Sequence, residues 1–121
     1  MDGQVVVFGP PQTLGTGEAQ VRVVAAYAIG LEVGVLVDAT GTEVPTPGRR
    51  PDPFVEAVDV VLEDGTRQPC SGLGGVISGG DRRAISVSSW EAPAEPRQLH
   101  LSVRGPDGIR SVDLVAQQGP E

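Results

Sequence analysis

The sequence has no lysine, and its nine basic residues are all arginines. Sixteen acidic residues outweigh them, so the formal net charge is -7 at pH 7. Binding to nucleic acids or to anionic membranes requires positive charge concentrated on one face. The sequence therefore predicts no nucleic-acid partner and no membrane partner.

Cysteine and histidine are equally scarce, with one of each. A single thiol, Cys70, cannot form an internal disulfide, and zinc sites use several cysteine or histidine ligands. The Gly-rich segment 72–80 lacks both the dinucleotide-binding spacing and the Gly-Lys-Ser/Thr of a phosphate-binding loop. We therefore expect no metal, no cofactor and no reactive thiol.

Targeting signals are also missing from the sequence. The N terminus has neither the basic nor the apolar segment of a secretory signal. No apolar run approaches the roughly 20 residues that span a bilayer. We expect a cytoplasmic protein.

What the sequence does contain is glycine and proline, 17 and 11 residues, between short stretches of alternating apolar and polar residues. A period of two is typical of half-buried strands, and no stretch shows a helical period. We predict one domain, 1–121: an all-β, antiparallel β-sandwich, Ig-like or jelly-roll-like, with about seven to eight strands. The predicted strands are 4–8, 19–28, 31–38, 54–62, 66–70, 84–90, 99–104 and 109–116, and the predicted loops include 40–53 and the Gly-rich 71–80.

The second and third strands are predicted to form a hairpin. A three-residue loop, 28–30, places Tyr27 opposite Leu31 and brings the apolar residues of both strands onto one face. Such loops end in a left-handed residue, so we expect Gly30 at positive φ. Tyr27 opposite Glu32 would contradict this register.

The strand 54–62 is apolar on both faces, which predicts a central strand. Asp64-Gly65 after it predicts a tight hairpin turn. The returning strand is short and contains Pro69, which predicts that it lies at an edge.

The last two strands are predicted to pair through the turn 105–108. This register places Leu101 opposite Val112, Leu99 opposite Leu114, and His100 opposite Asp113. A histidine beside a carboxylate is half of a catalytic triad, with Ser102 and Ser111 as neighbouring hydroxyls. No strained nucleophile turn accompanies them, so an exposed cross-strand ion pair is the favoured interpretation.

The half of the chain that begins at Phe54 resembles a known family. Its outline is an apolar strand ending in Asp64-Gly65-Thr66-Arg67, a glycine tract (72–75 and 79–80), and a strand ending in Trp90 before a proline-rich step. This outline resembles a family of small uncharacterised β-sandwich proteins common in high-GC Gram-positive bacteria. The tract here is shorter, and Ser89 replaces a usual second aromatic. The resemblance implies a fold and no established activity, so no catalytic residue follows from it.

Trp90 is the residue whose position the sequence leaves open. It falls on the opposite face of its strand from Ile85 and Val87, so either it lies on the outer face or a bulge near Ser88-Ser89 turns it inward. An exposed Trp90 would suit a carbohydrate or small-molecule binding module. A buried Trp90 would anchor the core.

We expect a non-enzymatic domain that acts through protein–protein contact or self-association, because no cluster of catalytic side chains is apparent. A virion or surface-assembly subunit is an alternative that fits the same fold. The expected contact surfaces are any unpaired edge strand and a set of residues in or beside the predicted loops: Arg49, Arg50, Arg82, Arg83 and Trp90.

Overall fold

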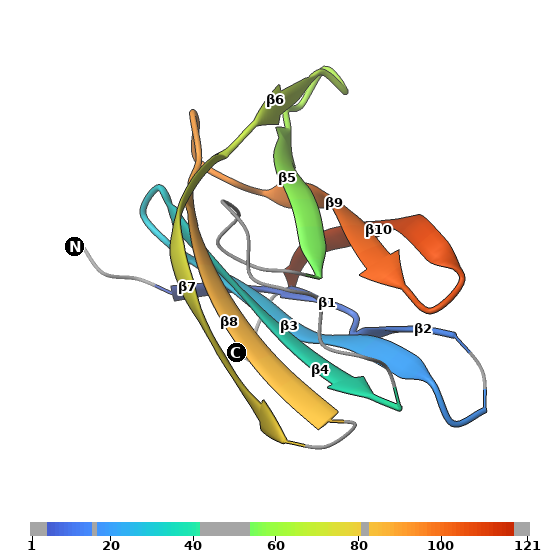
Figure 1. Ribbon diagram of the computed structural model, residues 1–121. Helices are drawn as coiled ribbons and strands as arrows, with labels where there is room; N and C mark the ends of the chain where they lie inside the picture. Colours follow the sequence, from blue (N-terminus) through green and yellow to red (C-terminus); the bar gives the residue numbers. More distant parts are fainter. Residues whose placement is uncertain (1–4, 16, 42–53, 81–82, 118–121) are drawn as a thin grey trace.

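The computed structural model describes residues 5–15, 17–41, 54–80 and 83–117 (Figure 1). These residues form ten strands and no helix, so the predicted all-β class is confirmed and the predicted count of seven to eight is too low. The two unexpected strands are β2 and β7. The strands are β1 (Val5–Gly9), β2 (Gln12–Leu14), β3 (Gln20–Ile29), β4 (Glu32–Thr40), β5 (Val55–Val61), β6 (Arg67–Pro69), β7 (Ser71–Gly80), β8 (Arg83–Glu91), β9 (Gln98–Gly105) and β10 (Gly108–Gln117).

All strand pairs are antiparallel and belong to one continuous sheet. Nine strands follow the order β6-β5-β9-β10-β1-β3-β4-β8-β7, and β2 pairs with β3 beside this path. The sheet curls into a half-barrel, so β5, β9 and β10 face β3, β4 and β8 (Figure 1). The expected sandwich of two separate sheets is not confirmed, because β1 joins the two halves by pairing with both β10 and β3.

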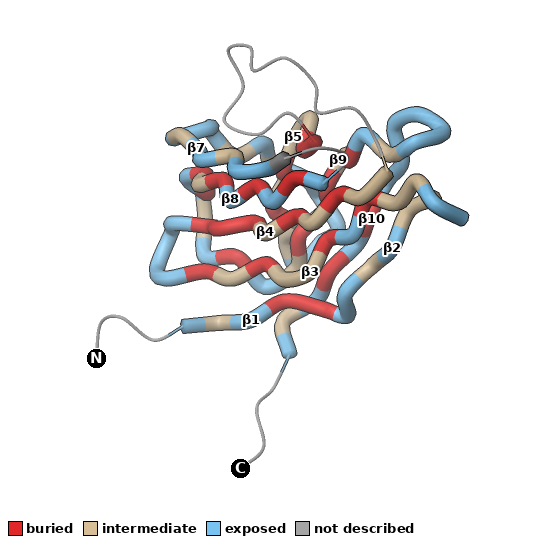
Figure 2. Tube along the Cα trace, turned by 60° about the horizontal axis from the view of Figure 1, so that its bottom comes forward, coloured by how far each residue is buried: buried red, intermediate tan, exposed pale blue. Residues whose placement is uncertain are grey.

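The core fills the concave side of this sheet. Buried and less buried residues alternate along most strands, as the period of two predicts (Figure 2). Valine is the commonest core residue, and Phe8, Phe54 and Trp90 are its aromatic members. With so few aromatics, burial of many small apolar side chains supplies most of the hydrophobic stabilisation.

The β3–β4 hairpin differs from the predicted register. Its loop is Gly30-Leu31, flanked by the pair of Ile29 and Glu32, so Tyr27 faces Gly34 instead of Leu31. Gly30 has a φ of 62°, so its predicted left-handed conformation is confirmed.

A β-bulge explains the error in register. The pairing of β3 with β4 shifts between Val23 and Ala25, which inserts one extra residue into β3. Val23 is buried before the bulge, and Ala26 and Ala28 are buried after it, so the inward face changes parity along one strand. A two-residue loop therefore leaves the apolar residues of both strands on the core side.

The β9–β10 hairpin has the predicted register. Leu101 lies opposite Val112, Leu99 lies opposite Leu114, and the loop closes at the pair of Gly105 and Gly108. Both cross-strand apolar pairs are buried.

The β5–β6 turn also forms where Asp64-Gly65 predicts it. Gly65 has a φ of 87°, and its N–H donates to the carbonyl of Leu62. The Thr66 N–H donates to the Asp64 carboxylate at 2.9 Å, and this bond is the main reason that the pKa of Asp64 is lowered from its ordinary value of 3.8. As predicted, β5 lies inside the sheet, between β6 and β9, and β6 forms an edge.

Candidate functional site

Trp90 lies in the core, with 5% of its surface exposed. Strand β8 pairs with β4 in one unbroken register from Arg83 to Glu91, so no bulge near Ser88-Ser89 turns the indole inward. Instead, the inward face of β8 carries Ala84, Ser86, Ser88 and Trp90, all buried. Small side chains before Trp90 leave space for the large ring, and its Nε1–H donates to Ser88 Oγ at 3.0 Å.

The inward position of Trp90 determines what β8 shows to solvent. Ile85 and Val87 lie on the outer face, where 41% and 38% of their surfaces are exposed. A binding module that used Trp90 as an aromatic platform would need the indole exposed. Trp90 is therefore not available as a contact residue. The large apolar side chains that β8 exposes to solvent are Ile85 and Val87.

Residues 71–80, which were predicted to form a Gly-rich loop, form strand β7, so that prediction was wrong. Strand β7 pairs with β8 from Ser71 opposite Glu91 to Gly80 opposite Arg83, with one bulge at Leu73. A Cβ at Gly79 would lie 2.4 Å from the carbonyl oxygen of Arg83, so the two backbones approach more closely than a side chain allows. Glycine here permits strand pairing that its low β-propensity does not predict.

Three exposed apolar side chains on one face of β7 and β8 form a surface that we call the edge patch: Val76, Ile85 and Val87. Leu73, at the bulge of β7, is also exposed. Val76 is the most exposed of the large apolar residues described, at 72%. Val76 lies opposite Val87, which lies opposite the half-buried Leu36 of β4. The patch therefore continues across neighbouring strands as an outward apolar row.

The edge patch lies at an end of the sheet. Among the described residues, no strand pairs with the far side of β7. The segment 71–80 contains no charged residue and no proline, the usual features that protect an edge strand from pairing. The other edge, β6, is three residues long and carries Arg67 and Pro69.

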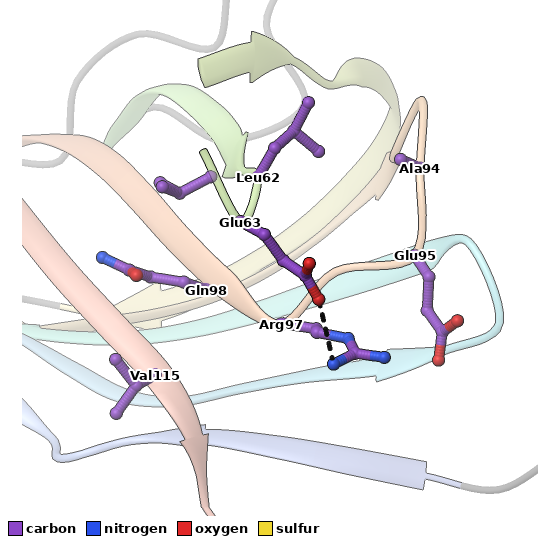
Figure 3. Close-up of a pocket in the computed structure, with 8 residues that line it drawn as sticks. Leu62, Glu63, Ala94, Glu95, Arg97, Gln98 and Val115 are labelled. Atoms are coloured by element: carbon purple, nitrogen blue, oxygen red, sulfur yellow. Dashed lines mark ion pairs between the residues drawn. The ribbon is translucent and has the colours of Figure 1, made fainter. Parts of the chain in front are cut away.

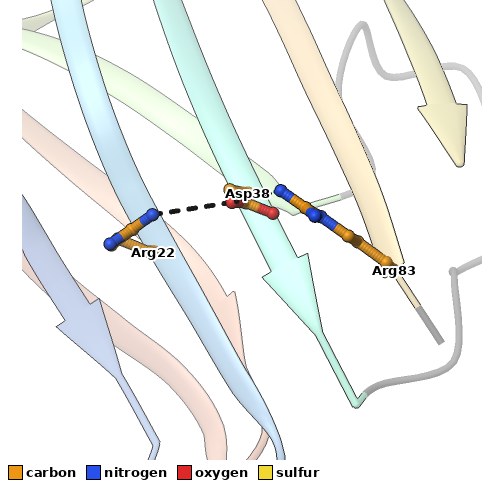
Figure 4. A network of polar contacts seen from close by, with 3 residues as sticks. All are labelled: Arg22, Asp38 and Arg83. Atoms are coloured by element: carbon orange, nitrogen blue, oxygen red, sulfur yellow. Dashed lines mark hydrogen bonds and ion pairs between the residues drawn. The ribbon is translucent and has the colours of Figure 1, made fainter.

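Charged side chains lie at both ends of β8 beside the patch. At one end, Asp38 lies between Arg22 and Arg83, with N–O distances of 3.6 Å and 3.4 Å (Figure 4). The side chains of both arginines are more than half exposed. At the other end, Glu32 lies opposite Glu91, and both are exposed.

The predicted contact arginines divide into two groups. Arg83 is exposed and lies on β8 next to the edge patch, where it pairs with Asp38. Arg49, Arg50 and Arg82 lie outside the described residues. Sequence reasoning missed Val76, Ile85 and Val87 as surface residues, and the signal that could have identified this surface was the long uncharged run from Ser71 to Gly80.

His100 pairs with Asp113 as the register predicts. Its Nδ1 lies 2.7 Å from the Asp113 carboxylate, and Asp59 of β5 is its neighbour on the other side. Asp113 is exposed. Ser102 and Ser111 lie opposite each other, and within the described ranges neither hydroxyl is hydrogen-bonded to the imidazole. The geometry is that of a cross-strand hydrogen-bonded pair.

Cys70 is half-buried, directly after β6. Burial raises the pKa of its thiol from the ordinary value of 9.0 to about 11, and the nearby charge of Asp59 acts in the same direction. The thiol is protonated at neutral pH and is a poor nucleophile, because the thiolate is the reactive form.

A shallow depression of about 480 Å³ lies between the β5–β6 turn and the start of β9 (Figure 3). Its one ion pair joins Arg97 to Glu63 at 3.5 Å, and both side chains are more than two-thirds exposed. A ligand site in such a depression would need convergent polar groups held away from water. The exposed Arg97–Glu63 pair does not meet this requirement.

The described residues contain no group of three or more His, Cys, Asp or Glu side chains that could hold a metal ion. In the same residues, no helix is long and apolar enough to cross a membrane. Comparison with protein-family models, curated proteins and solved structures finds no significant match.

Proposed function

We propose that this protein is a non-enzymatic domain that binds another protein surface through the edge patch. One observation carries the proposal: an edge strand whose segment 74–80 pairs regularly with β8 and has neither charge nor proline bears the most exposed apolar side chain described, Val76, beside two more on β8. Contiguous exposed apolar surface at a sheet edge is typical of protein contact sites. The unpaired backbone of β7 and the apolar side chains of the edge patch lie side by side, so one partner strand would contact both.

The electrostatic layout supports a protein partner. The patch itself is uncharged, whereas Arg83 and Glu91 mark its two ends with opposite signs. Interfaces are typically depleted of charge at their centres and polar at their rims. Rim charges of opposite sign fix the direction in which a partner strand lies.

A structural role in a larger assembly, such as a virion or surface layer, is the second candidate. The same unprotected edge favours it, because edge strands join subunits in extended assemblies. Within this proposal the two facing halves of the half-barrel correspond to the two layers of an Ig-like or jelly-roll-like sandwich. We also propose a cytoplasmic location, from the lack of a recognisable targeting signal, and kinship with the small β-sandwich proteins of high-GC Gram-positive bacteria, from the motif outline that begins at Phe54.

A comparative capture experiment tests the proposal. The natural chain, Val76→Lys and the control Val115→Lys are immobilised separately and exposed to extract of the source cell and to the purified chain. Val115 is exposed on β10, in the other half of the sheet, and both variants add one positive charge. We expect binding to the natural chain and the control and its loss with Val76→Lys. Equal binding by all three would contradict the proposal.

A further inference from the structure

We propose that the partner of the edge patch is a second copy of this chain, whose β7 pairs antiparallel with the first β7 across a two-fold axis. The inference rests on the proposed function and specifies its partner. It joins the two sheets into one continuous sheet, with each β7 between its own β8 and the β7 of the second copy.

The contrast between the two sheet edges supports backbone pairing at β7. Beyond the bulge at Leu73, the segment 74–80 pairs with β8 in regular register, so its far side presents an extended row of backbone groups. It contains only Gly, Val, Ile and Ser, and the small residues allow an incoming strand to approach. The short β6, with Arg67 and Pro69, is protected where β7 is not.

The side chains of this surface are self-complementary. A two-fold axis requires that one patch match itself. Val76 lies near the middle of β7, so antiparallel pairing about this position places it opposite or diagonal to Val76 of the second copy. The outward apolar row of Leu36, Val87 and Val76 then continues into the same three residues of the second copy, in the opposite order. This contact covers Val76, the most exposed apolar side chain described.

The charges favour this arrangement for a second copy in particular. A chain with a net charge of -7 repels itself, so association requires a contact region without acidic side chains. The uncharged β7 supplies such a region. Antiparallel pairing also places the Arg83 end of one β8 on the same side as the Glu91 end of the other, but the two β7 strands between them keep these charges about 14 Å apart, where salt screens most of their attraction.

Sedimentation equilibrium tests the inference over chain concentrations from about 1 μM to about 1 mM, where small interfaces dissociate. We expect a reversible shift from the 12.5 kDa mass of one chain to twice that mass. Val76→Lys places two like charges together, so it should weaken the dimer at least about tenfold, whereas Val115→Lys should change it by less than about threefold. A single chain at every concentration would overturn the inference, and so would equal weakening by both variants.

Cross-linking provides a readout that does not depend on a weakened variant. In a Cys70→Ser background, Val76→Cys should form a cross-linked dimer with a short bismaleimide, and Ile109→Cys, which is also exposed but lies on β10, should not. Equal cross-linking at both positions would indicate random collision and overturn the inference.

The two proposals fail in different ways. If the chain stays single but Val76→Lys still abolishes capture of another protein, the second copy is excluded as partner and the proposed function stands. If the chain stays single and capture is also unaffected, both are wrong.

Discussion

Replacing Trp90 with phenylalanine tests the packing that turns Ile85 and Val87 outward. The indole is buried, and its Nε1–H donates to Ser88 Oγ at 3.0 Å. Trp90→Phe removes both the donor and part of the ring volume, and leaves the fully buried Ser88 hydroxyl without that partner.

The expected loss of stability follows from these two contributions. An unpaired buried hydroxyl costs about 1–3 kcal/mol. The incomplete filling of the ring site adds about 1 kcal/mol, by analogy with other reductions of core side chains. We therefore expect Trp90→Phe to lower the free energy of unfolding by about 2–4 kcal/mol, a large fraction of the stability of an ordinary domain.

A double-mutant cycle with Ser88→Ala isolates the hydrogen bond. Urea denaturation followed by far-UV circular dichroism measures all four proteins without relying on tryptophan fluorescence. We expect the double variant to lose about 1 kcal/mol less than the sum of the single variants, because it removes both partners together. Additive losses within about 0.3 kcal/mol would exclude the Trp90–Ser88 bond. A Trp90→Phe variant as stable as the natural chain would refute the core position of the indole.

Other perturbations have equally definite outcomes. At pH 8, iodoacetamide should alkylate Cys70 about 100-fold more slowly than a thiol of pKa 9.0, and the rate should rise until about pH 11. The raised pKa also means that Cys70 contributes to the free energy of unfolding below pH 9 and that this contribution is lost as the pH rises through 11. Asp113→Asn should change the free energy of unfolding by less than about 1 kcal/mol, since the carboxylate is exposed; a larger loss in urea denaturation would show that the His100 pair is structural. Gly79→Ala should lower stability by about 1–3 kcal/mol, because its Cβ meets the Arg83 carbonyl oxygen, and an unchanged midpoint would show that the strands separate easily. The Thr66 amide resonance should titrate with a midpoint below pH 3.8, following the Asp64 carboxylate that it bonds, and a midpoint above that value would argue against the turn geometry.

Local chemistry made some of these elements predictable from sequence. The turn 105–108 and regular alternation on both sides of it determine the β9–β10 register, so the His100–Asp113 pair could be predicted. Asp64-Gly65 likewise specifies its turn, because glycine adopts the left-handed conformation cheaply.

Other elements depend on pairing that the local sequence does not encode. The bulge in β3 has no sequence signal of its own, yet it reverses the inward face between Val23 and Ala26. Strand β7 is extended because β8 pairs with it, although five of its ten residues are glycine.

The presence of an edge strand was predictable from the sequence, but the location of the edge patch was not. An unpaired edge was expected to make contact, and Arg83 does lie beside one. Its position depended on the face of Trp90, because the indole and not the pair of Ile85 and Val87 occupies the core. The strand face that carries Trp90 is the buried one, because burying the indole removes more apolar surface from water than burying a smaller side chain.

Amide hydrogen exchange along β7, measured at low and high chain concentration, tests the edge patch most directly. Amides of 74–79 that face away from β8 should exchange more slowly at high concentration, because a second strand pairs with them. The amides of Arg67 and Gln68 on β6 should exchange at the same rate at both concentrations. Exchange in β7 that does not change with concentration, or that slows equally in β6, would contradict the account.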